Sequence, residues 1–173
     1  LCMIAKNEEK LMEQCLNSVK SIVDEIIIMD TGSTDKTKEI AKKFSAKIFD
    51  FKWVDDFSAA RNESIRHAAK DWVLVLDADE ALDEDGLKAI KGLVSDKEND
   101  AFLFLQKNYT NESSVAGFVN EEHKKNNKTY AGWYGSFIAR LFRNKKGYQF
   151  QGTVHELVEP SIESKNGKIA AAS

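Results

Sequence analysis

Long apolar runs, proline and cysteine are scarce in this sequence of 173 residues, which holds one proline and two cysteines. No run approaches the roughly 20 apolar residues that a membrane-spanning helix needs, so we expect no membrane span. Cys2 and Cys15 fall in segments typical of a buried strand and a buried helix face, which favours packing as free thiols over a disulfide. That use of cysteine suits a reducing compartment, and we expect a cytoplasmic protein that is at most peripheral to a membrane.

Neither sign of charge dominates the composition. The net charge is −3 and the isoelectric point is about 5.7, which gives no reason to expect nucleic-acid binding. The one basic cluster, KKNNK at 124–128, is predicted to be a solvated loop. His67 and His123 are predicted to lie on the surface, and no set of cysteines and histidines has the spacing of a zinc site.

The first hundred residues alternate between apolar runs and amphipathic segments. Strands are predicted at 1–4, 26–29, 46–51 and 72–76, and helices at 11–19, from Ser33 or Thr34 to Phe44, and at 58–69. Strands that alternate with helices are typical of βαβ units. The predicted fold class is therefore α/β, with an open, mostly parallel sheet and helices on both faces.

The rest of the chain is predicted to form a smaller, mixed C-terminal part. A helix is predicted at 84–93 and strands at 101–106 and 136–142, with loops and small strands in the polar stretch 107–132. The chain opens on LCMIA, like a strand entered midway, and contains no recognisable signal peptide. We expect one domain over residues 1–160, trimmed at both ends, and a polar tail, 161–173, that is weakly structured at best.

Polar residues follow every strand predicted in the first part of the chain. They are AKNE at 5–8, DTGSTD at 30–35, Asp55 and Asp56 with Arg61 nearby, and DADE at 77–80. In open parallel sheets, ligands bind beyond the carboxyl ends of the strands, so these four exits are predicted to form one site. Asp77 and Asp79, one residue apart on an emerging strand, suit a divalent cation.

Other readings of these motifs are weaker. DTGS at 30–33 is also an aspartic protease signature, but that fold is all-β and needs a second Asp-Thr-Gly, which this chain lacks. A phosphoryl-transfer enzyme with an aspartyl nucleophile would want a small or hydroxyl residue after the second aspartate, where this chain has Glu80 and Ala81. Neither a Walker lysine loop nor GxGxxG occurs.

Four segments together resemble a known family: MIAKNEEKLMEQCLNSV, IIIMDTGSTDKTKEIAKKF, FSAARNESIRHAAKDWVLVLDADE and FQGTVHEL. In order and spacing they resemble family 2 glycosyltransferases with the GT-A (Rossmann-like) fold. They are most similar to the branch with lipopolysaccharide core glucosyltransferases and peptide S-glycosyltransferases. The resemblance covers about residues 1–158 and implies transfer of a sugar from a nucleotide-sugar donor, most simply a UDP-sugar, with inversion of the anomeric centre.

The resemblance also implies roles for individual residues. The nucleotide would contact the first two exits, with Asp30 accepting from the uracil N3–H, among the residues Ala5, Lys6, Asn7, Glu8, Asp30, Gly32 and Ser33. Asp79 would coordinate Mg²⁺ or Mn²⁺, and Asp77 would contact the ribose or a metal-bound water. Arg61 and Asn62 would lie near the diphosphate or the sugar. A surface role for Arg61, paired with Asp55 or Asp56, is the structural alternative.

VHEL at 154–157 falls where the family often places its last site residues. Glu156 or His155 could act as the base that takes the acceptor's proton, and His155 could instead be a third metal ligand. Both could also be structural. The acceptor (a glycan, a lipid-linked glycan or a peptide) cannot be read from the sequence. The rival functions are a nucleotide-sugar-binding domain that depends on further C-terminal elements and an aspartate-dependent phosphoryl-transfer enzyme.

Overall fold

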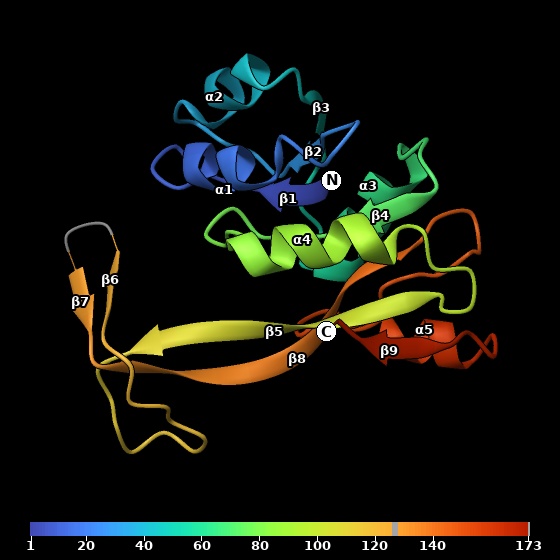
Figure 1. Ribbon diagram of the computed structural model, residues 1–173. Coiled ribbons are helices and arrows are strands. Elements are labelled where there is room, and N and C mark those ends of the chain that lie inside the picture. The colour runs from blue at the N-terminus through green and yellow to red at the C-terminus, as the bar shows by residue number, and fades with distance from the viewer. Residues whose placement is uncertain (126–127, 173) are drawn as a thin grey trace.

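A central sheet organises the molecule, as the computed structural model of residues 1–125 and 128–172 shows (Figure 1). Three parallel strands lie in the order β3 (Lys47–Asp50), β2 (Ile27–Asp30) and β1 (Cys2–Ala5). A parallel bridge from Cys2 to Val75 joins them to β4 (Trp72–Leu74). The sheet continues through β8 (Gly132–Arg143), β5 (Ala101–Thr110) and β9 (Ile169–Ala171), with β8 antiparallel to both its neighbours and β9 parallel to β5. The predicted mostly parallel α/β sheet is confirmed.

Alternate residues of the buried strands point to opposite faces, and helices cover both faces. One face packs under α1 (Met12–Val19), α2 (Thr37–Lys43) and α4 (Glu84–Leu93), where Met3, Ile28 and Leu74 join Met12 and Leu16 in one core. Met12 and Leu16 are fully buried, and each such side chain contributes about 1.5–3 kcal/mol. The other core, which includes Val73 and Val75, packs against α3 (Phe57–Arg66) and α5 (Glu159–Glu163).

Strands β5 and β8 form a long two-stranded arm, which corrects the predicted strand bounds. They pair from Ala101 with Phe142 to Thr110 with Gly132, and the arm carries the hairpin of β6 (His123–Lys125) and β7 (Lys128–Tyr130) (Figure 1). The outer half of the arm is solvated, so the sequence of its strands is polar. That polarity is the reason why the sequence predicts loops and small strands there. KKNNK therefore lies on β6 and β7, apart from 126–127, which are outside the described residues.

The tail is the second correction, because it is folded into the domain. β9 pairs with β5, and Ile162 of α5 is completely buried in the same core as Val73. Pro160 occupies the first turn of α5, where its missing N–H costs no helical hydrogen bond. The helix and the strand are each too short to produce a recognisable periodic pattern.

Removing the buried side chain in the tail tests this correction. Ile162→Ala is expected to lower the free energy of unfolding by about 2–5 kcal/mol, because it deletes fully buried methyl groups. Glu163→Ala, at the exposed neighbouring position of the same helix, is the control and should change stability by less than about 0.5 kcal/mol. Denaturant unfolding curves measure both. Equal stability of the two variants would contradict a packed tail.

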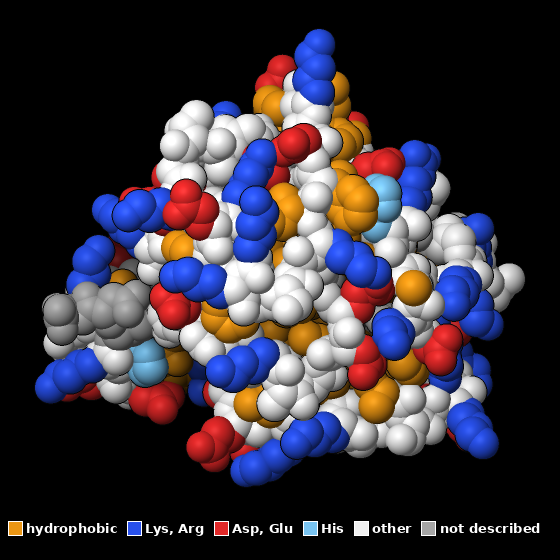
Figure 2. All heavy atoms as spheres, turned by 90° about the horizontal axis from the view of Figure 1, so that it is seen from above, with side chains coloured by type: hydrophobic (Ala, Val, Ile, Leu, Met, Phe, Trp, Pro, Cys, Tyr) orange, Lys and Arg blue, Asp and Glu red, His pale blue; other side chains and the backbone are white. Residues whose placement is uncertain are grey.

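The described surface agrees with the composition. Basic and acidic side chains are interspersed over the face seen in Figure 2. Cys2 and Cys15 are buried thiols that are not joined in a disulfide, as predicted. His67 and His123 are only partly exposed, because their rings stack on Phe49 at 3.7 Å and on Tyr109 at 3.9 Å between ring centroids. Among the described helices, none is long and apolar enough to cross a membrane.

Candidate active site

The exits of β1 and β2 lie side by side at the carboxyl edge of the sheet. The parallel register pairs Ala5 with Asp30. Beyond the strands, Asn7 Oδ1 accepts a hydrogen bond from the Thr34 amide at 2.8 Å, which ties the two loops together. Lys6 and Asn7 are exposed at this edge. The structure thus brings together the residues predicted to hold the nucleotide.

Asp30 is a buried carboxylate whose two oxygens differ in their contacts with the described residues. Its side chain is 1% exposed, and Oδ1 accepts from the amides of Gly32 at 3.0 Å and Ser33 at 2.9 Å. Gly32 has a φ of 110°, which a glycine adopts at little cost. Burial works to raise the pKa of Asp30, but hydrogen bonds from Ser33 and Gly32 and the nearby Lys38 ammonium outweigh it and lower the pKa. Oδ2 is buried and has no hydrogen-bond partner among the described residues.

The two aspartates of the third exit, Asp55 and Asp56, bond to residues other than Arg61. Asp56 caps α3, accepting from the Ala59 amide at 3.0 Å, and Asp55 accepts from the Trp53 indole at 2.8 Å. Neither carboxylate pairs with Arg61, so the surface alternative for Arg61 is wrong. The cap instead starts the helix that places Arg61 at the site.

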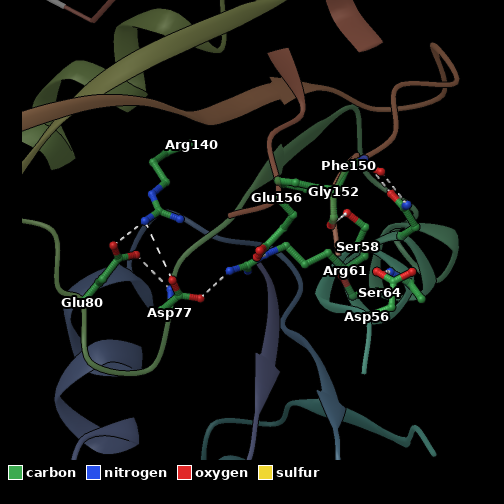
Figure 3. Close-up of polar contacts among 12 residues, drawn as sticks. Asp56, Ser58, Arg61, Ser64, Asp77, Glu80, Arg140, Phe150, Gly152 and Glu156 are labelled. Carbon is green, nitrogen blue, oxygen red and sulfur yellow. Dashed lines mark hydrogen bonds and ion pairs between the residues drawn. The ribbon is translucent and has the colours of Figure 1, made fainter. Parts of the chain in front are cut away.

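Arg61 is a buried cation that bridges two segments far apart in the sequence (Figure 3). Its side chain is 8% exposed; Nη2 lies 2.7 Å from Asp77 Oδ1, and Nε lies 2.5 Å from Glu156 Oε1. Burial works against the charged guanidinium, but the carboxylates of Asp77 and Glu156 outweigh it and raise the pKa of Arg61. Arg61 therefore remains a cation and fixes the exit of β4 against the 152–157 loop.

Arg140, which the sequence analysis did not single out, extends this network. It projects from β8, donates to Glu80, and lies 3.9 Å from Asp77 Oδ2 (Figure 3). Glu80 also accepts from Gln106 at 2.8 Å and from the Asp77 amide at 2.9 Å. Burial raises the pKa of Glu80 by more than Arg140 lowers it. The available signal was an arginine inside the otherwise apolar strand IARLF.

Asp79 differs from Asp77 because it is exposed, whereas Asp77 is partly buried between the two guanidinium groups. Burial raises the pKa of Glu8, and repulsion from Asp79, Asp35 and Asp77 adds to the rise. The exit of β1 and the exit of β4 are therefore close enough for their carboxylates to repel one another. A divalent cation would relieve that repulsion.

The described residues do not form a complete metal site by themselves. In residues 1–125 and 128–172, no group of three or more His, Cys, Asp or Glu side chains is arranged to hold a metal ion. Mg²⁺ commonly binds through one or two carboxylates and substrate phosphates, with water in the remaining positions. The exposed carboxylate of Asp79 beside the crowded acids fits that mode of binding.

The 152–157 loop packs against the start of α3. Ser58 Oγ donates to the Gly152 carbonyl at 2.6 Å, and the Phe57 amide donates to the Thr153 carbonyl at 3.1 Å. His155 is exposed, whereas the Glu156 side chain is 10% exposed and faces Arg61. Of this pair, His155 is the side chain that a ligand can reach.

The resemblance places Asn62 near the diphosphate or the sugar, but in the structure its side chain bonds to the backbone of Phe150. Its side-chain amide donates to the Phe150 carbonyl at 3.0 Å and accepts from the Phe150 amide at 2.7 Å. Both ends of the amide thus hold the segment before the 152–157 loop rather than the other predicted site residues.

Left-handed backbone conformations occur at two of the strand exits and in the 152–157 loop. Asn7, Asp55 and His155 have φ values of 57°, 56° and 56°. Such conformations are uncommon for residues other than glycine and often mark functional sites. They accompany the predicted site rather than define it.

Comparison with known proteins identifies the family. The sequence model described as Glycosyl transferase family 2 matches residues 1–153. The chain belongs to glycosyl transferase family 2. A TPR repeat-containing protein of Synechococcus elongatus is 42% identical over 162 residues, 94% of this chain and 36% of that protein. The SPbeta prophage-derived glycosyltransferase SunS of Bacillus subtilis is 33% identical over 156 residues, 89% of this chain and 33% of that protein.

Solved structures confirm the GT-A fold of this family 2 domain. Residues 1–349 of S. aureus TarS are 17% identical with a TM-score of 0.65, covering 98% of this chain and 56% of TarS. A second TarS structure, in complex with UDP, is 21% identical with a TM-score of 0.56, covering 70% of this chain and 39% of TarS. Glucosyl-3-phosphoglycerate synthase from Mycobacterium tuberculosis, in complex with Mn²⁺ and UDP-glucose, is 22% identical with a TM-score of 0.50. The match covers 59% of this chain and 41% of the synthase.

The family 2 domain described here is a glycosyltransferase domain, and it spans about a third of the length of these two curated relatives. The resemblance stated from the sequence motifs is therefore confirmed.

Proposed function

We propose that this domain transfers a sugar from a UDP-sugar donor, with inversion and with the help of Mg²⁺ or Mn²⁺. The observation that carries the donor assignment is the unpartnered oxygen of Asp30. A buried acceptor without a donor is costly unless a ligand supplies one. Uracil presents an N–H at N3, whereas cytosine presents an acceptor there. Neighbouring structures that bind UDP and UDP-glucose support the same donor class.

The donor assignment predicts a change in base preference. In Asp30→Asn, the amides of Gly32 and Ser33 should hold the new side-chain oxygen and leave the NH₂ group at the position of Oδ2. That NH₂ would oppose the uracil N3–H but could donate to cytosine N3. UDP affinity should fall about 10-fold or more, the range for a hydrogen bond to a charged group, and CDP affinity should rise.

Calorimetric titration measures the affinity of each variant for UDP and for CDP. The ratio of the two affinities does not depend on how much of the protein is folded. Asp71→Asn is the matched control, because Asp71 is exposed and lies just before β4, away from the strand exits. An unchanged UDP to CDP ratio in Asp30→Asn would reject the assignment.

The metal assignment rests on Asp79. We propose that Asp79 holds the cation, which would offset the charge of the departing diphosphate. Asp77 and Arg61 position that side of the site, since Asp77 is shared by the Arg61 and Arg140 guanidinium groups. The Mn²⁺ in the UDP-glucose complex of the synthase supports the choice of metal.

The 152–157 loop supplies the remaining groups. We assign His155 to the cation or to the proton of the acceptor, because it is exposed and adjoins Glu156, the partner of Arg61, which leaves the imidazole open to a ligand. Glu156 is instead assigned to holding Arg61, because the carboxylate of Glu156 is nearly buried and already paired. Detectable hydrolysis of UDP-glucose by this domain would favour an active enzyme over a domain that only binds the donor. Release of phosphate from a phosphomonoester would favour the phosphoryl-transfer alternative.

A further inference from the structure

A pocket of about 860 Å³ lies between α4 and the β5–β8 arm. Asp79 and Glu80 of the DADE exit line it, but the residues assigned to the nucleotide, Ala5–Glu8, Asp30, Gly32 and Ser33, do not. Asp79 therefore stands between the proposed nucleotide side and this pocket. A donor held at Asp79 through its diphosphate would direct its sugar toward the pocket.

One face of the arm turns into this pocket. Asn108 pairs across the ladder with Tyr134, and Gln106 pairs with Ser136, so all four side chains share a face. The hydrogen bond from Gln106 to Glu80 shows that this face points toward the DADE exit. Phe137 lies on the opposite face of β8, is 60% exposed and does not line the pocket.

The lining combines aromatic rings with neutral hydrogen-bonding groups. Tyr134 supplies a ring and Asn108 an amide on the same face, next to the Gln106 amide that is bonded to Glu80. Tyr109 and Tyr130 also line the pocket, where the Tyr109 ring stacks on His123 and contacts the Tyr130 ring. Ring faces pack against the C–H face of a pyranose, while amides bond its hydroxyl groups. The volume lies toward the upper end of the range of about 300–1,000 Å³ for small-molecule sites, which leaves room beyond the one transferred sugar.

The charges of the lining disfavour an anionic ligand. Arg140 is paired with Glu80, and the Lys107 ammonium lies over the Trp133 ring at 5.0 Å from its centroid. Asp79 and the nearby Asp83 also line the pocket. Among the described residues, the lining holds four acidic side chains (Asp79, Glu80, Asp83 and Asp85) against three basic ones (Lys107, Lys128 and Arg140), so a phosphate or carboxylate would meet an excess of negative charge.

We infer that this pocket binds the acceptor and that the acceptor presents an uncharged sugar unit there, stacked on Tyr134 and hydrogen-bonded to Asn108. This inference rests on the proposed function, because it takes Asp79 as the point where donor and acceptor meet. Tyr134 and Asn108 become the residues that determine acceptor specificity.

The test uses methyl pyranosides of glucose, galactose, mannose and N-acetylglucosamine as probes, with glucose 6-phosphate as the charged counterpart. Saturation-transfer NMR measures their binding to the protein saturated with UDP and Mn²⁺, and UDP affinity is measured on the same samples. At least one pyranoside should bind more tightly than glucose 6-phosphate. Tyr134→Ala should weaken it about 10-fold, as expected for loss of an aromatic contact, and Tyr134→Phe should restore binding.

Phe137→Ala is the matched control, because it removes an aromatic side chain from the opposite face of the same strand. It should leave pyranoside binding unchanged, and neither Tyr134→Ala nor Phe137→Ala should alter UDP affinity. Binding of UDP without any Tyr134-dependent pyranoside binding would overturn the inference and leave the proposed function standing. The inference would also be overturned if no pyranoside binds but an uncharged decapeptide that contains serine and cysteine does, in a way that depends on Tyr134. Pyranoside binding without UDP binding would instead reject the proposed donor while the sugar pocket stands.

Discussion

Arg61→Met is expected to lower the free energy of unfolding by about 3–5 kcal/mol, the usual cost of removing one partner from a buried ion pair. The substitution keeps most of the side-chain volume but leaves the Glu156 carboxylate, only 10% exposed, without its guanidinium. It also removes one of the two cations beside Asp77. The loss is large because a buried carboxylate without a partner has neither water nor a counter-charge.

A double-mutant cycle separates this cause from lost packing. Arg61→Met combined with Glu156→Gln should be more stable than Arg61→Met alone, because the unpaired charge is gone. Arg66→Met is the control on the same helix, since the Arg66 side chain is 72% exposed and its pair with Glu63 should be worth less than about 1 kcal/mol. Denaturant unfolding with a constant m-value measures the unaltered protein, Arg61→Met, Glu156→Gln, the double variant and Arg66→Met. Equal losses in Arg61→Met and the double variant would show that the ion pair does not account for the effect.

Asp79→Ala is expected to abolish the dependence of UDP binding on Mn²⁺. In the unaltered protein, UDP should bind tightly with Mn²⁺ and weakly in EDTA. In the variant both affinities should be equally weak, because the carboxylate proposed to hold the cation is gone. Hydrolysis of UDP-glucose should fall about 10²–10³-fold, the range for removing a group that stabilises charge developing in the transition state.

Asp85→Ala provides the matched control for this experiment. Asp85 also lines the pocket, but its side chain is 92% exposed in the first turn of α4 and is assigned no ligand. The control should keep the metal dependence. Equal UDP affinity in Mn²⁺ and EDTA for the unaltered protein would reject the metal assignment.

The fold was predictable where short-range pattern determines it. The apolar run IIIM and the helical spacing of Met12 and Leu16 predict a buried strand and a helix face without reference to any distant residue. The grouping of the residues that we assign to the nucleotide also followed from the strand order, because parallel strands end at one edge of the sheet.

Long-range pairings were not predictable in the same way. Arg140 reaches Glu80 only because β8 runs beside β4, and its neighbours in the sequence carry no sign of that pairing. Arg61 has Asp55 and Asp56 close by in the sequence, yet it pairs with Asp77 and Glu156. The local carboxylates were the obvious partners from the sequence. They are already engaged with the Trp53 indole and with the N-terminus of α3.

The pairing of β9 with β5 has a consequence for how the chain folds as it leaves the ribosome. Residues 101–103 emerge and can pair with β8, but their other edge has no native partner until residues 169–171 follow. During that interval the nascent sheet presents an open edge of backbone N–H and C=O groups, beside the apolar side chains that α5 later covers. Such an edge can pair with another chain, so the last strand ends a period of vulnerability to aggregation during synthesis.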